Sequence, residues 1–312
     1  MTTTLISPEA PATVNNTTIT DKTAAAVPFH RINTVSENHR WWKPIALVAL
    51  SVGIYAAMVA LLTYGTYLLS LDALRPGSMH ASPQGLAYNL LVWGCAIPAV
   101  LLARRILRFN PGQAISTTGR FRTRLFLVSL GLGTLLYASI FLTELLIDLV
   151  QGYQLELNIV SNLGWFMLVC IAFLPLQCAG EEFAFRSLIP QALGSWIKNP
   201  VIPFFVTTAL FAIGHGYPSL ATVVLFIQAA AFAYIVWRTN GIEWSIGLHL
   251  ANNLIAFTTG YLGLSDGDFS EGDITWIGFA IHVGTSIFFA LVIPAIHKRI
   301  ESTQTQTLAV EN

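Results

Sequence analysis

Long apolar runs separated by short polar connections dominate the chain after residue 43. The runs without Asp, Glu, Lys or Arg are 44–71, 76–103, 125–143, 157–180, 201–237, 244–265 and 274–296. Each is near or above the roughly 20 residues that a helix needs to cross about 30 Å of hydrocarbon. The run 201–237 is too long for one crossing and is interrupted at 214–218 by Gly-His-Gly-Tyr-Pro. We therefore predict an all-α, polytopic membrane helix bundle with about eight transmembrane helices.

The two ends of the chain lack this pattern. Residues 1–40 are rich in Thr, Ala, Pro and Asn without a sustained period, which predicts a disordered tail. Residues 298–312 are predicted to form a flexible C-terminal tail. The first apolar run follows too many polar residues, and is too long, to be the core of a cleaved secretory signal. We expect this run to remain as an anchor.

The connections between the runs differ sharply in positive charge. Lys and Arg gather before the first run, between the second and third, and in every second connection after that, whereas the alternating set contains Arg75. The alternating connections are instead acidic, as at Asp266, Asp268, Glu271 and Asp273. Positive connections stay on the cytoplasmic side of a membrane. Both termini are therefore expected to be cytoplasmic.

Overall composition narrows the class of protein further. Of the 312 residues, 54% are hydrophobic and 10% are charged, and the formal net charge is zero. So few charges could not solvate the surface of an ordinary soluble globule. A chain without net positive charge also lacks the basic field of a nucleic-acid-binding protein, so no nucleic-acid partner is expected.

Two adjacent acids interrupt one of the apolar runs. Glu181 and Glu182 lie in the sequence Cys-Ala-Gly-Glu-Glu-Phe-Ala-Phe-Arg. An ionised carboxylate in a bilayer costs about 2.5 to 3.5 kcal/mol on insertion scales, so both acids must face protein or water. Glu182 and Arg186 are four residues apart and can form a helix-positioning ion pair. Glu181 is then expected to have no partner in its own helix.

Three further polar side chains fall in later runs. His215 follows Phe211 by four residues, and Asn253 follows His249 by four, so each pair shares one helix face. With Glu181, these residues supply a carboxylate, two imidazoles and an amide from three different crossings. They are expected to converge in the bundle core, because separate polar groups in lipid would each need their own partners. Two other polar residues receive a simpler interpretation. We expect His282 to be an interhelical hydrogen-bond partner and Glu144 to lie near the outer boundary of the membrane.

These residues resemble the type II CAAX prenyl endopeptidase family, also called the CPBP or Abi family of intramembrane proteases. The family's motifs Glu-Glu-x-x-x-Arg, Phe-x-x-x-His and His-x-x-x-Asn occur here in order, at 181–186, 211–215 and 249–253. Ser187 departs from the Gly that often follows the Arg. The resemblance covers roughly residues 163–260. With the apolar runs and the composition of the ends, we expect a tail (1–40), a three-helix membrane segment (41–150), a CPBP-like catalytic core (151–297) and a second tail (298–312).

The resemblance implies a function and a role for each residue. It implies cleavage of peptide bonds of membrane-associated proteins or peptides, in a cavity open to the cytoplasm and the bilayer of, most simply, the plasma membrane. Glu181 would activate water with help from His215, while His249 and Asn253 would donate hydrogen bonds to the oxyanion. The resemblance gives a structural role, in support of the catalytic residues, to Glu182, Arg186 and Phe211. Preorganised donors in a cavity of low dielectric constant stabilise such a charge well.

Several alternatives stay open at this point. Glu181, His215 and His249 match the ligand types of some catalytic zinc sites, although the resemblance favours a mechanism without metal. A non-proteolytic immunity or interaction protein of the same fold is a second candidate function. A transporter that uses these polar residues as a proton or ion path is a third. The sequence does not specify the substrate.

Overall fold

The computed structural model describes residues 27–69, 82–152, 154–155, 157–217, 219–264 and 274–310, excepting the side chains of 219 and 304–310. The α-helices are α2 (Lys43–Leu68), α4 (Pro83–Gly94), α5 (Ala96–Ile106), α6 (Thr123–Val150), α7 (Leu163–Glu182), α8 (Ile189–Gly194), α9 (Val201–Gly214), α10 (Ser219–Thr239), α11 (Glu243–Tyr261) and α12 (Trp276–Val310). Short helical turns are η1 (Phe29–Val35), η3 (Pro111–Ala114) and η4 (Phe183–Leu188). No β-strand occurs among these residues, and the prediction of an all-α bundle is confirmed.

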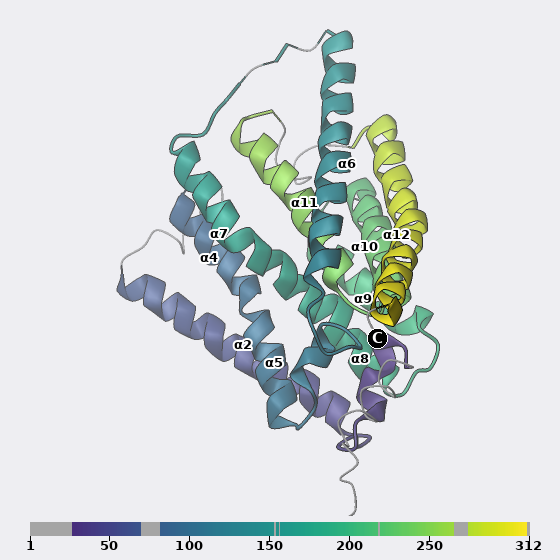
Figure 1. Ribbon diagram of the computed structural model, residues 1–312. Coiled ribbons are helices and arrows are strands. Elements are labelled where there is room, and N and C mark those ends of the chain that lie inside the picture. The colour runs from purple at the N-terminus through teal and green to yellow at the C-terminus, as the bar shows by residue number, and fades with distance from the viewer. Residues whose placement is uncertain are drawn as a thin grey trace, which may run out of the picture.

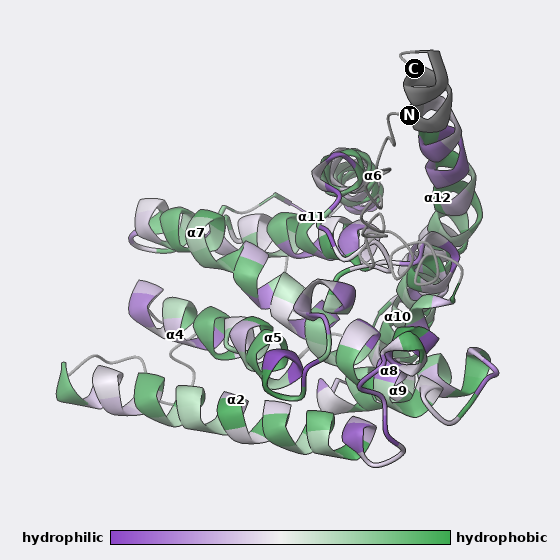
Figure 2. Ribbon diagram, turned by 60° about the horizontal axis from the view of Figure 1, so that its bottom comes forward, coloured by the Kyte–Doolittle hydropathy of each residue, from purple (hydrophilic) through white to green (hydrophobic). Residues whose placement is uncertain are grey.

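Six helical stretches are long and apolar enough to cross a membrane. They are Lys43–Leu68, Pro83–Ile106, Thr123–Val150, Leu163–Gly194, Leu220–Thr239 and Trp276–Thr303. The other two expected spans correspond to α9, which has 14 residues, and α11, whose His249, Asn252 and Asn253 lower its hydropathy. The count of eight therefore stays a prediction. Figure 2 shows hydrophobic residues along α2 and α7, and hydrophilic residues in the loops near α5 and α8.

Helix α11 lies at the centre of the arrangement. It packs along α6 on one side and against α7 on another, while α4 covers α7 and α12 covers α10 (Figure 1). Two glycines allow the close approach of α6 and α11. A side chain at Gly247 would collide with Ser129, and one at Gly133 would collide with Ala251. The first three long helical stretches are thus built into the same core as the later ones.

The expectation of a disordered tail through residue 40 is wrong for residues 29–35. Phe29, Ile32 and Asn33 of η1 are buried, and η1 packs against α8. The Nη1 group of Arg104 donates to Oδ1 of Asn33 (3.0 Å), and Nδ2 of Asn33 donates to a carbonyl of α8. Apolar burial and a buried arginine therefore fix a segment whose composition alone resembles a linker. Residues 1–26 lie outside the described residues.

The flexible tail expected from residue 298 is also wrong at its start. Helix α12 continues without a break past this point. His297 and Glu301 are paired across one turn at 3.2 Å, and Glu301 lies 3.8 Å from Arg122. These contacts extend the helix beyond its apolar stretch. Arg75 and the acidic residues expected in the alternating connections lie outside the described residues.

Candidate active site

The paired acids lie where α7 changes its helical geometry. Glu181 and Glu182 end α7, and the next six residues form a wider π-helical turn, η4. Such turns are rare inside α-helices and frequently lie at functional sites. Glu182 is fully buried, and its Oε1 lies 3.3 Å from Nη1 of Arg186. The guanidinium of Arg186 stacks over the Phe211 ring at 4.0 Å. The expected ion pair is therefore formed and is covered by an aromatic residue of the second motif.

His249 lies between the two carboxylates. Its Nδ1 is 3.0 Å from Oε1 of Glu182, and its Nε2 is 3.6 Å from Oε2 of Glu181. An ionised carboxylate only accepts hydrogen bonds, so the proton is on Nδ1, which donates a hydrogen bond to Glu182. The second acid thus orients the imidazole, and Nε2 is directed at the first acid. The side chains of Glu181 and His249 are 5% and 10% exposed, so little water screens their interaction.

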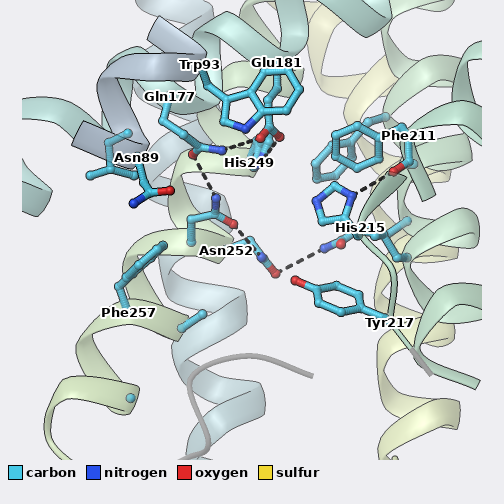
Figure 3. Close-up of a pocket in the computed structure, with 18 of the residues that line it drawn as sticks. Asn89, Trp93, Gln177, Glu181, Phe211, His215, Tyr217, His249, Asn252 and Phe257 are labelled. Carbon is cyan, nitrogen blue, oxygen red and sulfur yellow. Dashed lines mark hydrogen bonds and ion pairs between the residues drawn. The ribbon is translucent and has the colours of Figure 1, made fainter. Parts of the chain in front are cut away.

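His215 follows the end of α9. Its Nδ1 lies 2.7 Å from the Phe211 carbonyl oxygen, so Nδ1 is the donor and Nε2 of the neutral ring has a free lone pair. The ring also packs against Phe211 and Tyr217. Figure 3 shows it on the opposite side of the cavity from Gln177. His215 therefore offers an acceptor to a water or substrate in the cavity.

Glu181 has a partner in its own helix, contrary to the expectation from sequence. Nε2 of Gln177, one turn earlier, donates to Oε1 of Glu181 at 2.6 Å. Asn253 reaches the same cluster, because its Nδ2 donates to Oε1 of Gln177 at 3.2 Å. The other carboxylate oxygen, Oε2, is buried and accepts no hydrogen bond from the described residues. Glu181 is thus fixed through one oxygen, and the other remains available.

One cavity brings the expected residues together. It has a volume of about 480 Å³, and Glu181, His215, His249 and Asn253 all line it. Arg186 and Phe211 reach its wall as well. Its apolar wall comes from helices on both sides of α7 and includes Leu90, Trp93, Leu225, Phe232 and Phe257. The cavity therefore combines a few convergent polar groups with a largely apolar lining, which is typical of ligand sites.

The zinc alternative receives no support from the geometry. Among the described residues, no group of three or more His, Cys, Asp or Glu side chains is arranged to hold a metal ion. Glu181 and His249 are close to each other, but His215 does not complete a cluster with them. As arranged, these side chains do not fit a three-ligand zinc site.

Sequence analysis missed three polar residues at this site. Gln177, Asn252 and Gln228 all line the cavity. Gln177 could have been found, because it is four residues before Glu181 on an apolar helix. Asn252 directly precedes a motif residue, and Gln228 interrupts the apolar helix α10. By contrast, His282 and Glu144 lie 3.7 Å apart across α12 and α6, away from the cavity. This contact agrees with the interpretation of His282 as an interhelical partner.

Comparisons with known proteins agree with the motif pattern. Residues 163–255 match the family model described as type II CAAX prenyl endopeptidase Rce1-like. The uncharacterized protein YyaK of Bacillus subtilis (strain 168) is 26% identical over 227 residues, which cover 67% of this chain and 74% of YyaK. No solved structure matches the chain.

The matched region contains all three motifs and begins where α7 begins. It spans α7, η4, α8, α9, α10 and most of α11. These are the helices that contribute the two acids, both histidines and the asparagine. Of the six apolar helical stretches, two lie within this region and four lie outside it. The chain is therefore an integral multi-pass membrane protein whose residues 163–255 match the Rce1-like family of type II CAAX prenyl endopeptidases.

Proposed function

We propose that the protein is an intramembrane endopeptidase in which Glu181 activates a water molecule. The observation that carries the proposal is the free, buried oxygen Oε2 of Glu181 in the cavity lined by His215, His249 and Asn253. A carboxylate held in this way accepts a proton from water without first having to reorganise. The family match supports this class of reaction.

The proposed first step is attack of water on the scissile carbonyl carbon. Glu181 takes one proton from the water, and the new C–O bond pushes the carbonyl electron pair onto oxygen. His215 accepts the other water hydrogen through its free Nε2 and so orients the attack. Collapse of the tetrahedral intermediate breaks the C–N bond, and the proton held by Glu181 passes to the leaving amine.

His249 and Asn253 stabilise the negative oxygen in this proposal. The amide nitrogen of Asn253 has two N–H groups: it donates to Oε1 of Gln177 (3.2 Å) and to Sγ of Cys178 (3.6 Å), a weak acceptor that an oxyanion would replace. His249 uses Nδ1–H for Glu182, so its Nε2 donates when the ring carries two protons. The carboxylates of Glu181 and Glu182 lie on either side of the ring. An oxyanion donor of this kind typically contributes about 10²–10³ in rate.

The membrane setting limits the substrate to chains that reach the cavity from the bilayer or its surface. We propose membrane-associated proteins or peptides as substrates, the plasma membrane as the location, and a cavity open to the cytoplasmic side with both termini there. The apolar wall formed by residues such as Trp93 and Phe257 suits a hydrophobic segment.

A membrane-anchored reporter incubated with the purified protein tests this function. Wild type is expected to cut it, whereas Glu181→Ala and His249→Ala are expected not to. Glu144→Gln is the matched control, because Glu144 is also an acid in a helical span but contacts His282 away from the cavity. Equal cutting by all variants would refute the proposal. A cellular phenotype rescued in full by Glu181→Ala would instead favour the immunity or interaction protein.

A further inference from the structure

Four amide side chains form an unbroken line of hydrogen bonds that ends on Glu181. Gln228 donates to Oδ1 of Asn252 (3.2 Å), and Asn252 donates to Oδ1 of Asn253 (3.1 Å). Asn253 then donates to Oε1 of Gln177 (3.2 Å), which donates to the carboxylate (2.6 Å). At the far end, Nε2 of Gln228 also donates to the hydroxyl of Tyr137 at 2.8 Å. We call the residues Gln177, Asn253, Asn252 and Gln228 the amide chain; Figure 3 labels Gln177 and Asn252.

The carboxylate sets the direction of the whole amide chain. An ionised carboxylate only accepts, so Gln177 must turn its nitrogen to Glu181 and its oxygen to Asn253. Asn253 must then turn its nitrogen to Gln177, and the same requirement passes to Asn252 and Gln228. Reversing any one amide would bring two oxygens or two nitrogens together. All four dipoles therefore point their positive ends toward Glu181.

The amide chain also connects the site by hydrogen bonds to helices that carry none of the three motifs. Its members come from α7, α11 and α10, and Tyr137 at its end belongs to α6. Hydrogen bonds that follow one another in a region of low dielectric constant polarise each other, so each bond strengthens the next. A substitution of Gln228 is therefore expected to change the strength of the hydrogen bond that Glu181 accepts, although the two side chains are not in contact.

We propose that Gln177, Asn252 and Gln228 are positioning residues that hold Glu181 and Asn253 in their working orientation. This role rests on the proposed endopeptidase function. Gln177 fixes the carboxylate through Oε1 and leaves Oε2 without a hydrogen bond from the described residues, and Asn252 holds the amide of Asn253 at the cavity wall. Gln228 anchors the line to α10 and α6.

The first test measures kcat and KM separately for nearly isosteric variants. Gln177→Met should lower kcat about tenfold or more, because it removes a hydrogen bond to a charged group. Asn252→Leu and Gln228→Met should lower kcat by about 3- to 10-fold, because they act through their neighbours. The double variant Gln177→Met/Gln228→Met should have the same kcat as Gln177→Met alone, because Gln177→Met already breaks the hydrogen bond that connects the amide chain to Glu181. Independent structural damage would give multiplied losses instead.

Asn89→Leu is the matched comparison. Asn89 borders the same cavity, but its amide donates to the Gly85 carbonyl within α4 and not to the amide chain. We expect this variant to change KM without the loss in kcat. Gln228→Met is the mildest of the chain variants, since Gln228 is half-buried at the far end. Thermal unfolding of each variant shows that it is folded.

A second readout does not depend on catalysis. The infrared carboxylate band that disappears in Glu181→Gln belongs to Glu181, and Gln177→Met and Asn252→Leu should both shift it. If the band shifts while the wild type cuts no reporter, the endopeptidase proposal fails and the amide chain stands. If the wild type cuts but Asn252→Leu and Gln228→Met keep the wild-type kcat, or if the band does not move, the positioning role is overturned.

Discussion

The imidazole of His249 is held by Glu182, whose Oε1 lies 3.0 Å from its Nδ1. The two adjacent acids of α7 therefore have different surroundings. Glu182 is fully buried against Arg186 and His249, whereas Glu181 borders the cavity with one oxygen free. We therefore assign to Glu182 the role of orienting His249, and we propose Glu181 as the acid that takes part in the reaction.

Replacing Glu182 tests this division. Glu182→Gln keeps the size of the side chain but removes the charge that faces Arg186, leaving a buried guanidinium without its counter-ion. Breaking a buried pair in this way typically costs about 3–5 kcal/mol. We expect a lower free energy of unfolding, measured by denaturant titration in detergent. Glu37→Gln, at an exposed position, is the control and should be neutral; equal stability of the two variants would contradict the structural role.

The arrangement of the motifs could be predicted from the sequence because spacing in a helix fixes a shared face. Glu182 with Arg186, and Phe211 with His215, are brought together simply by being four residues apart. The contacts between helices could not be predicted in this way. The bond between His249 and Glu182 joins residues 67 positions apart, and its formation depends on the packing of α11 against α7.

Composition was misleading at the two ends of the chain. Residues 29–35 look like a linker by composition, yet Arg104 draws Asn33 into the core. Arg104 follows the second apolar run in the sequence, where positive charge indicates a loop, yet it is buried in the last turn of α5. Its amide partners, Asn33 and Gln191, lie 71 and 87 residues away in sequence, so local pattern could not reveal them.

Close packing of α6 and α11 predicts an effect of a single methyl group. Gly247→Ala should destabilise the protein by about 1–3 kcal/mol, because the new Cβ would collide with Ser129 and with the backbone of α6. Gly131→Ala is the control, since a Cβ there meets nothing within 4 Å. Chemical denaturation of both variants measures the difference. A Gly247→Ala protein as stable as Gly131→Ala would contradict the packing.

Metal dependence gives a third prediction. Because Glu181, His215 and His249 do not form a three-ligand cluster, chelators are expected to leave the cleavage rate unchanged. The measurement compares reporter cleavage before and after treatment with a strong zinc chelator, together with metal analysis of the purified protein. Loss of activity on chelation, restored by added zinc, would contradict the metal-free mechanism.

The packing of residues 29–35 (η1) against α8, called docking below, is expected to depend on pH. Burial lowers the pKa of His30, and the nearby Arg31 lowers it further, although a hydrogen bond to the Lys198 carbonyl opposes this. Protonation is thus easier in the undocked state. Docking is therefore fully stable above the ordinary His pKa of about 6.5 and weakens as the pH falls.

Hydrogen exchange of residues 29–35 measures this effect. After correction for intrinsic exchange rates, we expect protection at pH 8 to exceed protection at pH 5. His30→Leu lacks the titrating ring and should show a smaller difference between the two pH values. If wild type and His30→Leu responded equally to pH, another group would have to control the segment.

The most direct measurement is the rate at which purified Glu181→Gln cuts a membrane-anchored peptide in ¹⁸O-labelled water. The wild type should place one heavy oxygen in the new carboxyl terminus, as detected by mass spectrometry. Glu181→Gln, which keeps the shape but cannot take a proton from water, should be slower by a factor of about 10²–10⁴, the usual contribution of a general base. Cleavage by Glu181→Gln at the wild-type rate would contradict the account.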